Sequence, residues 1–131
     1  MTDAGTAPRR RARITRSGDF DAVYRRGRSA ANRHLVVYAF SRDDRPAGAP
    51  ARLGLSVSRK VGGAVERNRV KRVLREQFAG LVPGLPGGLD VVVIARPGSS
   101  EYLDERGSEA LGARLAELAE RATRPPAERT P

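Results

Sequence analysis

The sequence predicts an α+β fold in which helices lie on one short mixed sheet, an α-β-β-α-β-α sandwich. Two kinds of pattern predict it. Alternating or continuous apolar residues predict three strands, at residues 29–40, 52–59 and 89–96. Apolar residues at helical spacing predict three helices, at about 17–27, 65–80 and 107–122.

The length of 131 residues predicts a single domain. We place it at residues 14–122, because the two ends lack apolar periodicity. The first 13 residues are small, polar and basic, and residues 123–131 hold prolines and charges, so both ends are predicted to be disordered tails.

The first helix is predicted from its end signals and one apolar face. Ser17 suits the N-cap and Gly27 the C-terminal stop. Phe20, Val23 and Tyr24 share a face. The strand that follows, 29–40, is apolar on both faces.

The second strand has two unequal faces. Leu53, Leu55 and Val57 make an apolar one, whereas the other is small and polar: Gly54, Ser56 and Ser58. The third strand is continuously apolar and is predicted to be the most buried. A turn at 97–100, with Ser99 or Ser100 as a cap, is expected before the last helix.

Charge and composition narrow the function. The chain has 25 basic and 15 acidic residues, a net charge of +10, and no cysteine, which excludes disulfides and thiol catalysis. The longest apolar run, Val91 to Ala95, is too short to span a membrane, and no secretory leader is visible, so we expect a cytoplasmic protein.

Cationic side chains concentrate between Arg59 and Arg75. Helical spacing places Arg67, Lys71 and Arg75 on one row, and Arg69 and Arg72 on the next. Like charges four residues apart cost a few tenths of a kcal/mol per pair. A solvated charged face is the simple alternative, but two cationic rows favour a polyanion, and above all RNA.

Two nearby features have more than one interpretation. Asn68 is either an N-terminal cap or turn residue, or a donor to RNA. Gly62 and Gly63 match no nucleotide-binding motif and are interpreted as permitting a sharp turn into the helix.

A second candidate site combines aromatic and small residues. Phe20 and Tyr24 are predicted to face the sheet surface that holds Tyr38. With the small polar residues of the second strand, and with Arg59 and Lys60 at its border, they form either a trough for single-stranded RNA or plain core. The residues alone do not decide between an RNA-binding trough and a hydrophobic core.

Catalytic groups are scarce. His34 is the one histidine, lies in a strand, and is predicted to be structural. No carboxylate grouping has metal-site or paired acid–base spacing. The protein is therefore predicted to supply no catalytic residue and no metal site, and any chemistry comes from its partner.

Several ordered motifs resemble one family, the protein subunit of bacterial ribonuclease P. The segment from Glu66 to Arg72, ERNRVKR, resembles that family's RNR signature helix, and the preceding segment, GLSVSRKVG, its strand and turn. Further matches are Asp19-Phe20, Ala31-Asn32-Arg33 and the strand from Asp90 to Arg96.

The resemblance implies a ribosomal-protein-like fold with a left-handed βαβ crossover. It implies the non-catalytic subunit of an endoribonuclease that removes the 5′ leader of precursor tRNA, in which the RNA subunit is the catalyst and requires Mg²⁺. The protein is then the partner of ribonuclease P RNA and precursor tRNA. It is expected to bind no cofactor of its own and no small-molecule substrate, and not to associate with a membrane.

The resemblance also assigns the residues. It implies that the signature helix faces the catalytic RNA, through Arg67, Asn68, Arg69, Lys71, Arg72 and Arg75. It implies that the leader occupies a cleft formed by Phe20, Tyr24, Tyr38, Ser56, Ser58, Arg59 and Lys60. The competing hypotheses are a structural RNA-binding protein of ribosomal type, a helix-turn-helix regulator and a standalone nuclease.

Overall fold

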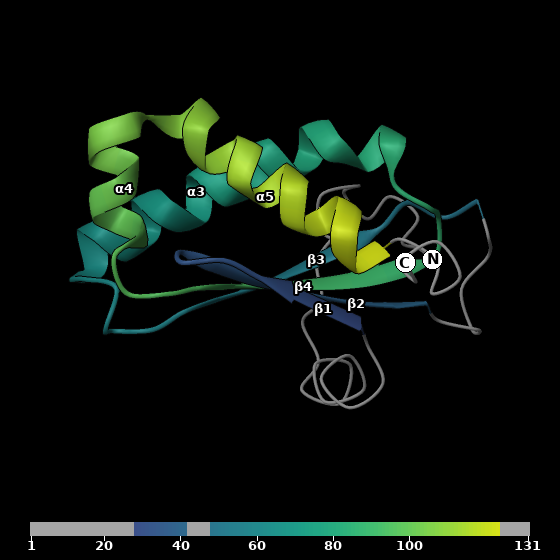
Figure 1. Ribbon diagram of the computed structural model, residues 1–131, viewed down its shortest axis with the longest axis horizontal. Helices are drawn as coiled ribbons and strands as arrows, with labels where there is room; N and C mark the ends of the chain where they lie inside the picture. Colours follow the sequence, from purple (N-terminus) through teal and green to yellow (C-terminus); the bar gives the residue numbers. More distant parts are fainter. Residues whose placement is uncertain (1–27, 42–47, 124–131) are drawn as a thin grey trace, which may run out of the picture.

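The computed structural model describes residues 28–41 and 48–123, which form two layers (Figure 1). One layer is a four-stranded sheet of order β1-β2-β4-β3. The other consists of helices on one face of that sheet, as the sequence predicts. The first predicted helix, 17–27, and the predicted N-terminal tail, 1–13, lie outside the described residues. So does the predicted C-terminal tail, 123–131, except Thr123, which is the buried last residue of α5 and was wrongly assigned to the tail.

The sheet is mixed, as expected. Its strands are β1 (Arg28–Ala31), β2 (Leu35–Ser41), β3 (Arg52–Val57) and β4 (Leu89–Ala95). β4 lies at its centre, antiparallel to β2 and parallel to β3. The parallel pair is connected through a helix, which is the βαβ unit of the predicted order.

The prediction of one strand over 29–40 is wrong, because a tight turn divides it into β1 and β2. The Oδ1 of Asn32 accepts hydrogen bonds from the amides of His34 and Leu35, at 2.9 and 2.8 Å. The amide of Asn32 also donates to the carbonyl of Leu35. An asparagine side chain that binds the backbone in this way competes with strand pairing.

The described helices are α3 (Ala64–Leu81), α4 (Ser99–Arg106) and α5 (Ser108–Thr123), with a 3₁₀ turn η1 (Val82–Gly84). The turn predicted at 97–100 with a serine cap is partly wrong, because α4 starts at Ser99 and Gly98 is its N-cap. Only Leu103 is a buried apolar residue in α4, so helical periodicity was too weak to predict it. Gly107, at φ 92°, separates α4 from α5.

The core lies between the helices and one face of the sheet. The apolar side chains predicted for α3 are all at most 2% exposed: Val70, Val73, Leu74 and Phe78. The α5 stripe is also fully buried: Leu111, Leu115, Leu118 and Ala122. These stripes fix which faces of α3 and α5 turn away from the sheet.

The opposite face of the sheet carries the small residues of β3. The register aligns Tyr38, Val92 and Gly54 in one row, and Val36, Ile94 and Ser56 in the next. Val92 is fully buried there and packs with Tyr38, Phe40 and Ile94.

Candidate RNA interface

The cationic residues of α3 lie outside its buried stripe, as predicted. Asn68 and Arg72 are exposed, while the other four are partly buried: Arg67, Arg69, Lys71 and Arg75. Long arginine and lysine side chains can pack their stems and still present their charges. We refer to these six residues as the α3 cationic face.

Arg69 has protein partners on a second helix. Its guanidinium is ion-paired with Asp104 of α4, and it also donates to the carbonyl oxygen of Ser100 at 3.4 Å. Arg69 therefore connects α3 with α4. A phosphate that binds Arg69 must therefore compete with the carboxylate of Asp104 for its guanidinium.

Arg72 and Arg67 have weaker contacts with the rest of the protein than Arg69 has. Arg72 lies 3.8 Å from Glu76 in an exposed i,i+4 pair, with 63% of its own side chain accessible, and such pairs contribute little. The Nε of Arg67 is buried and has no hydrogen-bond partner. A charged donor without an acceptor favours a ligand that supplies one.

Asn68 is not a cap. It lies inside α3, is exposed, and the N-cap is Gly63, which makes no side-chain capping bond. The cap interpretation is therefore wrong, and a contact of Asn68 with RNA stays a prediction.

The glycines before α3 serve the turn. Gly62 has φ 158°, and a Cβ on it would lie 2.9 Å from the Cβ of Glu66. A larger residue there would collide with the first turn of the helix. This turn joins the α3 cationic face to the exposed residues Ser58, Arg59 and Lys60.

Those three residues follow β3 in a hydrogen-bonded turn. The amide of Val61 donates to the carbonyl of Ser58, and the amide of Lys60 donates to the Ser58 hydroxyl at 3.3 Å. The turn therefore has a defined shape, with two cations in solvent beside the start of α3.

The predicted leader cleft is described only in part. Tyr38 and Ser56 are both half-buried and lie on the sheet face opposite the helices, in neighbouring rows. Phe20 and Tyr24 lie outside the described residues, so their place opposite this face stays a prediction. The described part brings together Tyr38, Gly54 and Ser56, and Ser58 follows at the end of β3.

His34 has surroundings that the sequence did not indicate. Its ring centroid lies 4.3 Å from that of Tyr102, and burial together with Arg33 and Arg114 lowers the pKa of His34. Arg33, Tyr102 and Arg114 come from the β1–β2 turn, α4 and α5. These residues are far apart in the sequence and belong to no common motif. Tyr102, an isolated aromatic residue in a polar segment, was the one sequence feature that pointed to this place.

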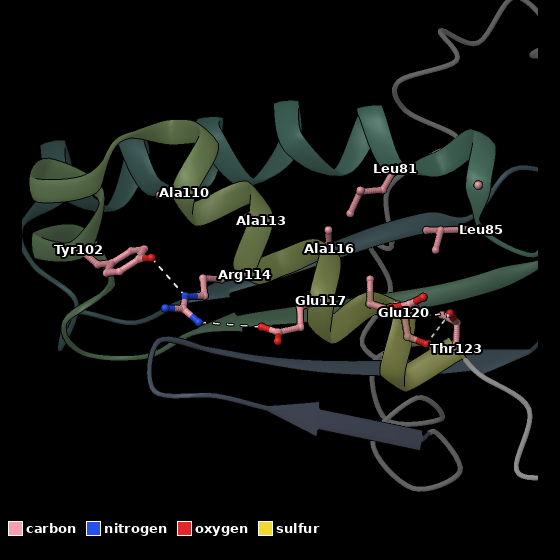
Figure 2. Close-up of a pocket in the computed structure, with 12 residues that line it drawn as sticks. Leu81, Leu85, Tyr102, Ala110, Ala113, Arg114, Ala116, Glu117, Glu120 and Thr123 are labelled. Atoms are coloured by element: carbon pink, nitrogen blue, oxygen red, sulfur yellow. Dashed lines mark hydrogen bonds and ion pairs between the residues drawn. The ribbon is translucent and has the colours of Figure 1, made fainter. Parts of the chain in front are cut away.

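A broad groove follows the outer side of α5 (Figure 2). Apolar and small side chains line most of it, including Leu81, Leu85, Ala113 and Ala116, with Arg114 and Glu117 along α5. Its ionisable lining residues are Tyr102, Arg114, Glu117 and Glu120, and it does not adjoin the sheet face of Tyr38.

Within residues 28–41 and 48–123, no cluster of three or more histidine, cysteine or acidic residues could hold a metal ion. In the same part of the chain, no helix has the length and apolar character needed to cross a membrane.

Comparison with known proteins gives one consistent result. The family model described as Ribonuclease P matches residues 9–122. The chain is 48% identical over 86 residues to a "Ribonuclease P protein component" from Brevibacillus brevis, covering 66% of each chain. It is 39% identical over 103 residues to one from Bacillus cereus, covering 79% of this chain and 87% of that one.

A solved structure agrees with these matches. The chain resembles the RNase P protein from Thermotoga maritima with a TM-score of 0.72 and 32% identity. That comparison covers 83% of this chain and 96% of the Thermotoga protein.

Proposed function

Because the chain belongs to the family of ribonuclease P protein components, we propose that it binds the catalytic RNA subunit and the 5′ leader of precursor tRNA. In this role it promotes endonucleolytic maturation of the tRNA 5′ end. The α3 cationic face, held outward by a fully buried stripe, is the observation that carries the proposal.

The α3 cationic face suits a folded RNA. Its cations lie on a formed helix, so little backbone entropy is lost when phosphates bind, and contact relieves repulsion between the arginines. Arg67 and Arg72 can both offer charge to a phosphate, because the Nε of Arg67 has no hydrogen-bond partner and Arg72 makes only an exposed pair with Glu76.

The opposite face of the sheet suits a single strand. Tyr38 on β2 and Ser56 on β3 are separated by β4, which corresponds to about 10 Å across the strands. Small residues beside an aromatic ring leave space for a base to stack, and Arg59 and Lys60 stand at the end of β3 for its phosphates. Phe20 and Tyr24 complete this cleft in the proposal.

The proposed division of labour leaves the chemistry to the RNA. The RNA subunit performs hydrolysis with Mg²⁺, and the protein binds no cofactor. The protein contributes positive charge, which screens repulsion between enzyme RNA and substrate, and leader contacts, which raise substrate affinity. Such a holoenzyme acts in the cytoplasm.

Reconstitution tests the proposal. Purified protein is mixed with a bacterial ribonuclease P RNA, and cleavage of precursor tRNA is followed at low Mg²⁺ beside protein-alone and RNA-alone controls. We expect cleavage only in the mixture. Tight, salt-sensitive RNA binding without stimulation would instead identify a structural RNA-binding protein of ribosomal type.

A further inference from the structure

A polar pocket of about 470 Å³ lies at the end of the sheet where β4 finishes, apart from the α3 cationic face and the leader cleft. Three elements form it: the β1–β2 turn, α4 and the first half of α5. The residues that matter here are Asn32, Arg33, His34, Tyr102, Arg106 and Arg114.

Aromatic rings form the centre of this pocket. The rings of His34 and Tyr102 are 4.3 Å apart and tilted by 30°. Two guanidinium carbons lie over the Tyr102 ring, that of Arg114 at 5.7 Å and that of Arg106 at 6.0 Å. The Nε of Arg114 also donates to the Tyr102 hydroxyl at 3.2 Å, and Figure 2 shows Arg114 between Tyr102 and Glu117.

The charges that lower the pKa of His34 are positive. After burial, Arg33 and Arg114 are the causes that lower its pKa, and no carboxylate is among them. Cations that gather around one imidazole repel one another, and an anion placed among them would relieve that repulsion.

An unpartnered donor lies beside these cations. The Oδ1 of Asn32 is held by the amides of His34 and Leu35, so the amide group has a fixed orientation. Its Nδ2 is buried and has no hydrogen-bond partner. A buried donor without an acceptor costs free energy that a ligand oxygen would recover.

Two acidic residues also line the pocket. Glu101 and Glu105 come from α4 and are exposed to solvent, as are Arg33, Arg106 and Arg114, but neither glutamate is ion-paired with these arginines. Glu117 approaches Arg114 only to 4.0 Å, and both side chains are about half exposed, so this pair is weak.

We propose that this pocket binds a phosphate group of an RNA backbone, held by Arg33, Arg106 and Arg114 with the amide of Asn32. The preference for an anion comes from the pocket itself, whereas its identification as RNA rests on the proposed function. Arginine is suited to the task because its planar guanidinium binds phosphate oxygens in pairs.

The place of the pocket supports an RNA ligand. Val57 of β3 pairs with Ala95 of β4, which pairs with Leu35 of β2. The pocket and the turn with Arg59 and Lys60 therefore lie at the same end of the sheet. An RNA strand bound at that turn could therefore reach the pocket by continuing along this end of the sheet.

The sole histidine makes the test direct, since its imidazole resonance is unambiguous in NMR spectra of the full chain. The probes are hexauridylate and inorganic phosphate, each at constant ionic strength with chloride as reference. We expect hexauridylate to shift the His34 resonance saturably and to raise its pKa. Arg114→Gln should weaken the apparent affinity for hexauridylate about tenfold, as expected for one lost charge-assisted hydrogen bond.

Arg121→Gln is the matched control, because Arg121 is an exposed arginine on the same helix outside the pocket. It should change the apparent affinity less than twofold. Arg106→Gln provides a second variant should Arg114→Gln fail to fold. An unshifted His34 resonance, or equal binding by the Arg114 and Arg121 variants, would overturn the proposal.

The two probes separate the possible sources of phosphate. Saturation by inorganic phosphate together with no response to hexauridylate would overturn the assignment to RNA and identify a site for free phosphate. The readout at His34 does not depend on catalysis. Failed reconstitution would therefore count against the proposed function, not against an anion site.

Discussion

Arg69 of α3 is ion-paired with Asp104 of α4, so one arginine of the α3 cationic face also joins two helices. The pair is partly open to solvent, with 34% of the Arg69 side chain and 57% of the Asp104 side chain accessible. A carboxylate in this position reduces the positive charge that Arg69 offers to an RNA.

Neutralising that carboxylate should strengthen RNA binding at little cost in stability. For Asp104→Asn we expect a loss of less than about 1 kcal/mol in the free energy of unfolding, because exposed ion pairs contribute little. Affinity for ribonuclease P RNA, measured by filter binding, should rise. Glu109→Gln removes an exposed acid from α5 and serves as the control. An equal gain from both variants would show that Arg69 is not involved.

Salt dependence should report on Arg72, which is exposed and only weakly paired. Arg72→Gln should lower the slope of log K against log salt for the RNA subunit by about 0.7–0.9, the value for one lost phosphate contact. Arg121→Gln is the matched control. If the slope of the Arg72 variant equals that of the wild type, Arg72 does not contact a phosphate.

Tyr38 tests the leader cleft within the described residues. Tyr38→Ala should weaken binding of precursor tRNA to the holoenzyme by about 1–3 kcal/mol, the cost of one lost stacking contact. Binding of mature tRNA, which has no leader, should barely change, and Tyr38→Phe should retain most of the affinity. Phe20→Ala with Tyr24→Ala should act in the same direction. Equal losses for precursor and mature tRNA would contradict the cleft.

A buried ion pair between β3 and β4 should matter for stability. Asp90 is fully buried and accepts two hydrogen bonds from Arg52, at 2.7 and 2.6 Å. Asp90→Ala removes one partner and leaves a largely buried guanidinium, so we expect a loss of about 3 kcal/mol in urea unfolding. A loss below about 1 kcal/mol would mean that Arg52 finds solvent or another partner.

Acid should destabilise the protein in part through His34. Burial, Arg33 and Arg114 lower the pKa of His34 in the folded state below the ordinary histidine value of 6.5, so the unfolded chain binds the proton more readily. This contribution to stability is present above pH 6.5 and is lost as the pH falls towards the folded-state pKa. His34→Gln should reduce the change in unfolding midpoint between pH 7 and pH 5. An unaltered pH dependence would contradict this assignment.

The main elements were predictable because their signals are local. The buried stripe of α3 follows from Val70, Val73, Leu74 and Phe78, and the two faces of β3 follow from simple alternation. The division of the first strand depends on one side chain, Asn32, that binds backbone amides. Helix α4 lacks an apolar stripe, so its formation depends on contacts with the rest of the fold.

The site was predictable where its residues are consecutive. The α3 cationic face could be read from helical spacing alone. The ion pair of Arg69 with Asp104 could not be predicted, because 35 positions separate the residues and the sequence does not show which surface charges pair. The pocket around His34 also joins three elements, and only the folded chain brings Arg33, Tyr102 and Arg114 together.

A Mg²⁺ titration tests the central claim most directly. Single-turnover cleavage of precursor tRNA by ribonuclease P RNA is measured across Mg²⁺ concentrations, with and without the protein. If the protein supplies positive charge to the RNA–RNA complex and grips the leader, the midpoint should move to lower Mg²⁺ when protein is present. An unchanged midpoint, with protein bound to the RNA, would contradict the account.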